Sequence, residues 1–345
     1  MTKTKYFFFR NDQRQEYFEF NPQDPDCLRA SGYQYFGLVC HHLWPLLKFR
    51  GLEIIVTPWT VHELPKYGKN VIAIIVQDEW GRAPRYLQKV GAVFKTCGLF
   101  PITREAFKYG TFKEKIASGL GQGKFLWKDY GGHIKACMQR VLGQRTAPVF
   151  TIPLGCYAYS DIDFVPFDLR TNDLFFAGSV QHGKKINIPR PKEMARRRML
   201  MALDNLNYMY PQIRIARRVT SGFSESINSQ PDVYLQTMMN AKFCPIPRGA
   251  NLETFRFYEA IRYGSIPIAE ALPDLDHYKN SPVIRLKDWK ELSSVVMSFH
   301  LDPEKSKDMH NKCLEHWKNV CSETAVAKHI ADKISYLDLS AIDNA

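Results

Sequence analysis

The sequence predicts an α/β protein built from two doubly wound domains. Apolar runs of strand length alternate with helical patterns in the first half, and the same alternation restarts near residue 173. The length of 345 residues suits two domains, and 45% apolar residues suffice for two cores. We expect an N-terminal domain over residues 1–155, a second domain over 156–303, and a helical tail over 304–345 that packs back toward the first domain.

In the first half, the clearest buried strand is expected over residues 70–77. Its continuous β-branched run fits a parallel sheet covered on both faces. Other strands are expected at residues 6–9, 52–56, 92–95 and 150–154, and helices at 32–50 and 85–90. The glycine- and lysine-rich stretch 110–143 is interpreted as a loop. Its GLGQGK segment lacks the phosphate-loop pattern, since Phe125 follows Lys124.

The second half repeats this organisation. Strands are expected at residues 173–178, 213–217, 242–247, 265–269 and 284–286. Helices are expected at residues 193–206, 232–240, 255–263 and 289–299, followed by a long helical pattern over 303–337.

A formal net charge of +12 favours an anionic partner. Nucleic acid, a nucleotide-sugar, an acidic glycan and an anionic membrane are the candidates. Residues 184–218 hold ten lysines and arginines against two acids. This stretch is either a binding surface or a solvated helix face. No RRM, KH, zinc-finger or helix-turn-helix pattern supports nucleic acid, so we expect none as a partner.

The eight cysteines are dispersed and form no CxxC pair, which favours free thiols in a reducing compartment. The N-terminus resembles no signal peptide, and no apolar run reaches the length of a membrane span. We therefore expect a cytoplasmic protein, and its charge leaves peripheral binding to an anionic membrane open.

The most informative segment covers residues 241–270 and has the order strand, loop, helix, glycine, strand. Its loop lies at the carboxyl end of a strand, where open α/β sheets bind ligands. Gly249 allows a close backbone approach, and the helix N-terminus suits a diphosphate. Arg256 can pair with phosphate oxygens, and Glu259 on the same helix face can accept both hydroxyls of a ribose.

This segment resembles the C-terminal signature of exostosin-like (GT47-type) glycosyltransferases. The matching positions are Cys244, Pro247, Arg248, Gly249, Phe255, Arg256, Glu259, Ala260, Gly264, Ile266, Pro267 and Ile268. The segment FFAGS at 175–179, followed by the arginines at 196–198, is similar to the family's Phe-x-Gly turn. The segment IPLGCY at 152–157 is similar to the Pro-x-Gly segment at the junction between the domains of many GT-B enzymes. Two departures are Glu253 to Phe255, where a small residue is usual, and Ser265, where cysteine is common.

The resemblance implies a GT-B fold of two Rossmann-like domains facing across a cleft. It implies a metal-independent, inverting transfer of a sugar from a nucleotide-sugar, UDP-linked in most of the family, in polysaccharide or glycoconjugate biosynthesis. The donor would lie in the C-terminal domain, and a glycan or lipid-linked glycan acceptor in the N-terminal domain. No cofactor is expected.

The resemblance also assigns roles on the donor side. Arg256 would stabilise the leaving diphosphate and Glu259 would bind ribose. Arg248 would steer phosphate or sugar, with Gly249 beside it. Gly178 and Ser179 would contact phosphate, and Arg198, within the arginines at 196–198, could reach the diphosphate or form a solvated helix face.

An inverting transfer needs one general base, expected in the N-terminal domain. Asp78 and Glu79 directly follow the strand at 70–77 and are the first candidates. His41 is an alternative, together with His42 and Glu63. Two further function classes stay open: a basic nucleic-acid- or polyanion-binding protein without activity, and a glycan-binding protein without turnover.

Overall fold

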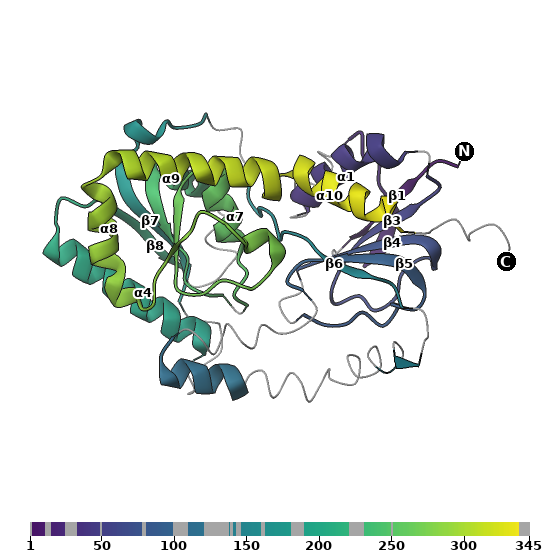
Figure 1. Cartoon of the computed structure of the whole chain (residues 1–345), viewed down its shortest axis with the longest axis horizontal. Coiled ribbons are helices and arrows are strands. Elements are labelled where there is room, and N and C mark those ends of the chain that lie inside the picture. Colours follow the sequence, from purple (N-terminus) through teal and green to yellow (C-terminus); the bar gives the residue numbers. More distant parts are fainter. Residues whose placement is uncertain are drawn as a thin grey trace.

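A computed structural model describes residues 2–10, 15–24, 33–48, 50–77, 81–98, 110–120, 138, 141–142, 146–159, 163–180, 190–220, 231–249 and 251–337. They form two α/β domains, each around one largely parallel sheet (Figure 1). The predicted α/β class, with two doubly wound, Rossmann-like domains, is confirmed. Among the described residues, no helix combines the length and the apolar character needed to cross a membrane.

The N-terminal sheet has six strands in the order β2-β1-β3-β4-β5-β6. Their bounds are Lys5–Arg10 for β1, Glu16–Glu19 for β2, Glu53–Pro58 for β3, Gly68–Val76 for β4, Val90–Lys95 for β5 and Val149–Thr151 for β6. Only β2, which the sequence did not predict, pairs antiparallel. All side chains from Val71 to Val76 are buried, as the β-branched run predicts.

Two layers cover this sheet. On one face lies α1 (Gln34–Leu47), whose Val39, Cys40 and Leu43 are fully buried in a core with the sheet. On the other face, Leu64, Tyr86 and other loop residues form a smaller core. The helix predicted at 85–90 is wrong: residues 85–89 form a turn. A segment this short gains too little from its few hydrogen bonds to nucleate a helix.

The C-terminal sheet is parallel throughout, in the order β11-β10-β9-β7-β8. Its strands are β7 (Asn172–Ser179), β8 (Ile215–Thr220), β9 (Ala241–Pro245), β10 (Ile266–Ala269) and β11 (Ile284–Arg285). Because β8 lies on one side of β7 and the later strands lie on the other, the strand order reverses between β7 and β9. Such a switch point opens a crevice at the carboxyl ends of the strands.

Helices α4 (Pro191–Met209), α6 (Pro231–Met239), α7 (Phe255–Arg262), α8 (Leu292–His300) and α9 (Pro303–His316) surround this sheet (Figure 1). In α4, a buried stripe of Ala195, Met199, Ala202 and Leu206 faces the core. Proline at the first position of the helix has the φ that a helix start requires.

The chain then returns to the N-terminal domain. After α9, a π-helical turn (Trp317–Cys321) leads into α10 (Glu323–Ser335), which the Ser322 hydroxyl caps by accepting from the Ala325 N–H at 3.2 Å. Val326, Ala327 and Ile330 of α10 are buried in one core with α1 and the first sheet (Figure 1).

The loop predicted over residues 110–143 is wrong for residues 112–120, which form a helix. Thr111 and Glu114 cap it reciprocally: the Glu114 N–H donates to the Thr111 hydroxyl at 3.3 Å, and the Thr111 N–H donates to the Glu114 carboxylate at 3.0 Å. The Thr-x-x-Glu spacing of this capping box is a sequence signal for a helix start, which the surrounding glycines obscure.

The cysteines of the described residues, Cys40, Cys97, Cys156, Cys244, Cys313 and Cys321, are buried free thiols. This agrees with the prediction; Cys27 and Cys137 lie outside the described residues.

Candidate functional site

The C-terminal switch point gathers most of the predicted donor-side residues. Gly178 and Ser179 end β7, while Arg248 and Gly249 follow β9 after a short connection. Helix α7 begins behind that loop at Phe255. Its Thr254 N-cap makes no side-chain capping bond, so the first N–H groups of α7 gain no partner from it.

Arg256, in the first turn of α7, reaches the end of β7. Its Nη2 donates to the Ala177 carbonyl, and its guanidinium carbon lies 4.8 Å from the centre of the Phe176 ring. Gly178 permits this approach. A Cβ there would lie 2.7 Å from Nη2 of Arg256 and 3.6 Å from Nη1 of Arg196. The two guanidinium groups therefore meet over one glycine.

Arg196 comes from α4 and donates to the carbonyl of the buried Ser179. Only 7% of Arg196 is exposed. Burial, and then the neighbouring charge of Arg256, lower the pKa of Arg196 to about 9. The guanidinium still carries its charge at neutral pH.

This arginine pair (Arg196 and Arg256) forms no ion pair with a carboxylate of the described residues, although the charge of Arg256 reaches the buried Glu259. Among the described residues, no carboxylate lies within ion-pair distance of either side chain. The Nε atoms of both are buried without a hydrogen-bond partner. Buried cations and unused donors cost free energy unless an anion compensates them. The geometry thus suits a bound anion.

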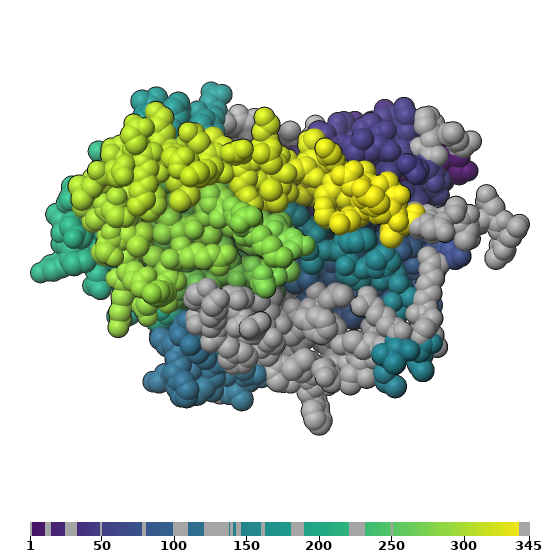
Figure 2. Space-filling model, viewed as in Figure 1, coloured from purple at the N-terminus to yellow at the C-terminus, as the bar shows by residue number. Residues whose placement is uncertain are grey.

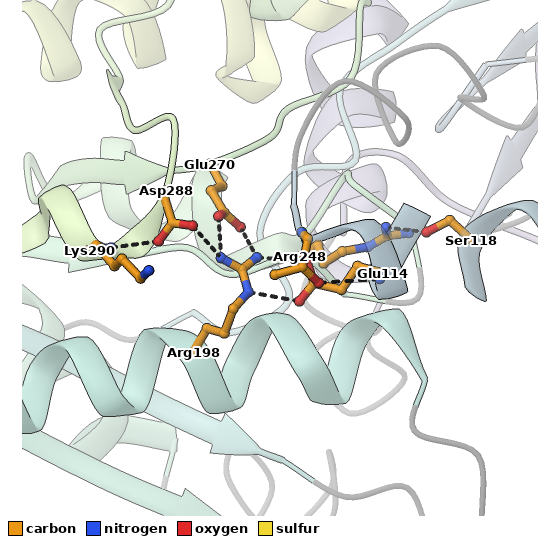
Figure 3. A network of polar contacts seen from close by, with 8 residues as sticks. Glu114, Ser118, Arg198, Arg248, Glu270, Asp288 and Lys290 are labelled. Carbon is orange, nitrogen blue, oxygen red and sulfur yellow. Dashed lines mark hydrogen bonds and ion pairs between the residues drawn. The ribbon is translucent and has the colours of Figure 1, made fainter. Parts of the chain in front are cut away.

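Arg198 points elsewhere (Figure 3). Its guanidinium donates to Glu114 at 2.9 and 2.7 Å and to Glu270 at 2.6 and 2.7 Å, and lies 3.7 Å from Asp288. Burial lowers its pKa, but the hydrogen bonds that it donates to both carboxylates outweigh this and raise the pKa above its usual range. Arg198 therefore stays charged, and the carboxylates of Glu114 and Glu270 compensate its charge within the protein.

Arg248 also contacts helix 112–120, donating from Nη1 to the Ser118 hydroxyl at 2.9 Å (Figure 3). Burial lowers its pKa, while Glu114 and Glu270 oppose that effect. Its Nε is buried without a partner. It stands at the end of the neighbouring strand with one donor unused.

Glu259 is 1% exposed and lies inside the protein. It accepts from the Tyr234 hydroxyl at 2.7 Å and from the Ala158 N–H at 3.3 Å. Burial raises the pKa of Glu259. These hydrogen bonds and the charge of Arg256 lower it, but they only partly offset the effect of burial. The contact to Ala158 ties α7 to the segment between the domains; the ribose role stays a prediction.

Among the predicted bases, the structure describes only His41, His42 and Glu63. Asp78 and Glu79 lie outside the described residues, but Gln77 before them has a φ of +61°, a strained value for a residue with a side chain. His41 sits on α1 with Nδ1 2.7 Å from the Pro22 carbonyl. Burial and then His41 lower the pKa of His42. In the described contacts, Glu63 takes part only through its backbone carbonyl, which accepts a hydrogen bond from the Tyr17 hydroxyl.

Sequence reasoning missed a buried carboxylate between the domains, Glu253. It accepts from the Cys97 N–H of the N-terminal domain at 2.8 Å and from the Tyr258 hydroxyl, and lies 3.0 Å from Nε2 of His277. Burial raises its pKa, but the hydrogen bonds and charge of His277 and the bonds from Tyr258 and Cys97 outweigh this and lower it. Nothing in the sequence pattern joined these distant residues.

The family described as "RXYLT1 C-terminal domain" matches residues 192–332 of this chain. Ribitol-5-phosphate xylosyltransferase 1 of Mus musculus is 29% identical over 110 residues, which are 27% of this chain and 24% of that protein. The Homo sapiens protein of the same name is 33% identical over 89 residues, 21% of this chain and 19% of that protein. The matched part thus spans about a quarter or less of each relative.

Two of the solved structures to which this chain is similar are transferases by name. Pneumococcal O-GlcNAc transferase GtfA, in complex with UDP and GlcNAc, has a TM-score of 0.44 at 10% identity, covering 81% of this chain and 58% of its own. AviGT4, from avilamycin A biosynthesis, has a TM-score of 0.39 at 11% identity, covering 93% and 91%. In sequence, the C-terminal half of this chain is similar to the C-terminal domain of xylosyltransferases, while the exostosin-like resemblance stays a prediction.

Proposed function

We propose that this protein is a glycosyltransferase that binds the diphosphate of a nucleotide-sugar at the arginine pair. The observation that carries this proposal is the meeting of two guanidinium groups over Gly178, at the sheet's switch point. Arg196 is buried and Arg256 partly buried, and neither forms an ion pair among the described residues. A diphosphate supplies two negative groups and several acceptors, which match the unused donors.

The surroundings favour a leaving diphosphate. The first N–H groups of α7 add a partial positive charge. Charge grows on the diphosphate as the glycosidic bond breaks, and preorganised cations stabilise that charge most strongly. Arg196 and Arg256 can do this themselves, which supports the expectation of metal-independent transfer. The names of the sequence relatives support the same reaction class.

The acceptor would lie on the N-terminal side. Asp78 or Glu79 follows β4 at its carboxyl end and would take the proton of an acceptor hydroxyl in an inverting displacement. The strained φ of Gln77 marks this point of the chain. A glycan or lipid-linked glycan is the proposed acceptor, and UDP the proposed nucleotide, as in the exostosin-like family that residues 244–268 resemble.

The test is a thermal-shift and calorimetric panel of UDP, GDP, CMP and their common sugar conjugates. We expect one nucleotide to stabilise the protein, by about 2.7 kcal/mol at 100 times its Kd. Arg256→Ala and Arg196→Ala should weaken its binding about ten- to a hundredfold, since each removes charged hydrogen bonds.

Arg217→Ala is the matched control. This arginine is half-exposed and pairs with Asp204 on the surface, so its loss should leave nucleotide affinity unchanged. Stabilisation by no nucleotide, or equal losses in all three variants, would contradict the proposal. Stabilisation by oligonucleotides instead would favour the polyanion-binding alternative.

A further inference from the structure

Helix 112–120 lies on the C-terminal domain with its polar side inward. Glu114 and Ser118 are 3% and 4% exposed. They face Arg198 and Arg248, the partners in the network of Figure 3. Helix residues four positions apart lie on one face, so this pair defines the docked side.

The opposite side of the helix is an apolar stripe (Phe112, Ile116 and Leu120). These side chains are 77%, 48% and 69% exposed. An amphipathic helix in a globular protein ordinarily buries its apolar stripe and exposes its polar face. Here the arrangement is inverted, so the apolar stripe is left for a partner outside the described part of the protein.

The same edge of the molecule carries more apolar surface. Helix 112–120, in blue, and the short segment at 141–142, in teal, both lie along the lower edge of the view in Figure 2. Val141 and Leu142 are 86% and 68% exposed. Apolar side chains thus occur at two places along one edge.

Charge identifies the partner. Lys113 is exposed and Lys115 half-buried beside the stripe, while Glu114, the only acid of this helix, is buried against Arg198. A second copy of the chain would bring like charges together, since each carries a net +12. A surface that is both apolar and anionic fits better, and a bilayer with anionic headgroups combines the two.

We propose that helix 112–120 docks this protein on anionic membranes. Phe112, Ile116 and Leu120 enter the boundary between headgroups and acyl chains, and Lys113 and Lys115 stay at the level of the lipid phosphates. The polar contacts to Arg198 and Arg248 hold the helix in this orientation. The inference does not depend on the proposed transfer activity.

The test is cosedimentation of the full chain with vesicles of phosphatidylcholine, alone or mixed with phosphatidylserine. We expect binding to the mixed vesicles. Leu120→Glu should weaken it more than about tenfold, because an inserted leucine is replaced by a charge that anionic lipid repels. Lys113→Gln should weaken it about fivefold, and only where phosphatidylserine is present.

Leu169→Glu is the matched control, since Leu169 is also 69% exposed. It ends a short 3-10 helix whose Phe167 packs on His310 of α9, at the opposite edge from helix 112–120 in Figure 1. Equal melting temperatures of the variants establish that folding is intact. No sedimentation with mixed vesicles, equal loss in Leu169→Glu, or a dimer in light scattering that Leu120→Glu dissolves would each overturn the proposal.

Discussion

Arg196 and Arg256 reach the end of β7 from two different helices, so the position of each depends on the small residue between them. Gly178 leaves room that no other residue leaves: a Cβ would lie 2.7 Å from Nη2 of Arg256. The group that such a Cβ would displace is the guanidinium of Arg256, which is the proposed binding group itself. The proposed binding of a diphosphate by Arg256 therefore depends on the absence of a side chain at position 178.

Gly178→Ala should displace Arg256 and weaken nucleotide binding about tenfold, since one charged hydrogen bond is lost. Because Gly178 has a φ of +156°, the alanine also adds backbone strain, and folding stability should fall by more than about 1 kcal/mol. Calorimetric titration and urea unfolding measure the two effects separately.

Gly51→Ala serves as its control. Gly51 has a φ of +65°, and a Cβ there would meet Thr2 at 3.3 Å, far from any arginine of the pair. It should cost stability and leave affinity intact. Equal affinity losses in both variants would show that backbone strain, and not Arg256, was measured.

Glu253 should make folding stability depend on pH. Its pKa is lowered in the folded protein, so its contribution is full above the unfolded value near 4.5 and disappears as pH falls through the folded value. Glu253→Gln should cost about 3 kcal/mol at neutral pH, because it leaves His277 and the Cys97 N–H without their charged partner.

Urea unfolding of wild type and Glu253→Gln at a series of pH values checks this. The difference should shrink below pH 4.5. Glu19→Gln, which removes an exposed pair with Lys5 at 3.7 Å, should change little at any pH. A difference for Glu253→Gln that is constant over pH would disprove the role of its charge.

Among single residues, the sequence predicted Gly178 at the end of a strand and Arg256 in the first turn of a helix, and the structure has both there, while their binding roles stay predictions. It selected Arg198 over Arg196, and helical periodicity does not separate them. Arg196 lies three positions before the buried Met199, while Arg198 lies three positions after the buried Ala195 and four before the buried Ala202. Glu253 could not be predicted, because its partners Cys97 and His277 meet it only after both domains have formed.

At the level of elements, the buried strands were predicted best. β4, β7 and β10 are continuous apolar runs between turn residues, and that local signal fixes a parallel strand. Edge and short elements were predicted worst: β2 has only partly buried or exposed side chains and thus no periodic pattern to detect. Helix 112–120 has an outward apolar stripe, so its composition gave no reason to expect a packed element.

Helix α10 is an element whose stabilising role lies in the other domain. Ile330 is fully buried in the core that α1 and the first sheet share. Ile330→Ala should destabilise the N-terminal domain by about 2–5 kcal/mol through the cavity it leaves. Hydrogen exchange should then show reduced protection of β1 and β3 amides before those of β7 and β9.

Lys328→Ala is the control on the same helix, since Lys328 is exposed and contributes no core atoms. It should leave all exchange rates unchanged. Equal loss of protection in both sheets after Ile330→Ala would mean that the two domains unfold as one unit.

At the scale of the whole molecule, contacts of the described residues join parts that are far apart in the sequence, and three of them lie near the domain boundary. The Cys97 N–H donates to Glu253, the Ala158 N–H to Glu259, and the Tyr35 hydroxyl to the Cys321 carbonyl at 2.6 Å. The number and class of domains could be predicted because each sheet is encoded by its own continuous segment. The relation between the domains could not, since it depends on single side chains at their boundary.

The return of α10 to the first domain also sets an order of events during synthesis. The core of β1, β3 and α1 includes Val326, Ala327 and Ile330, which leave the ribosome only after every strand of the second domain. The C-terminal sheet can complete its core earlier, from one uninterrupted stretch. The domain made first is therefore finished last, and until then its unfilled apolar groove is the surface a nascent-chain chaperone would meet.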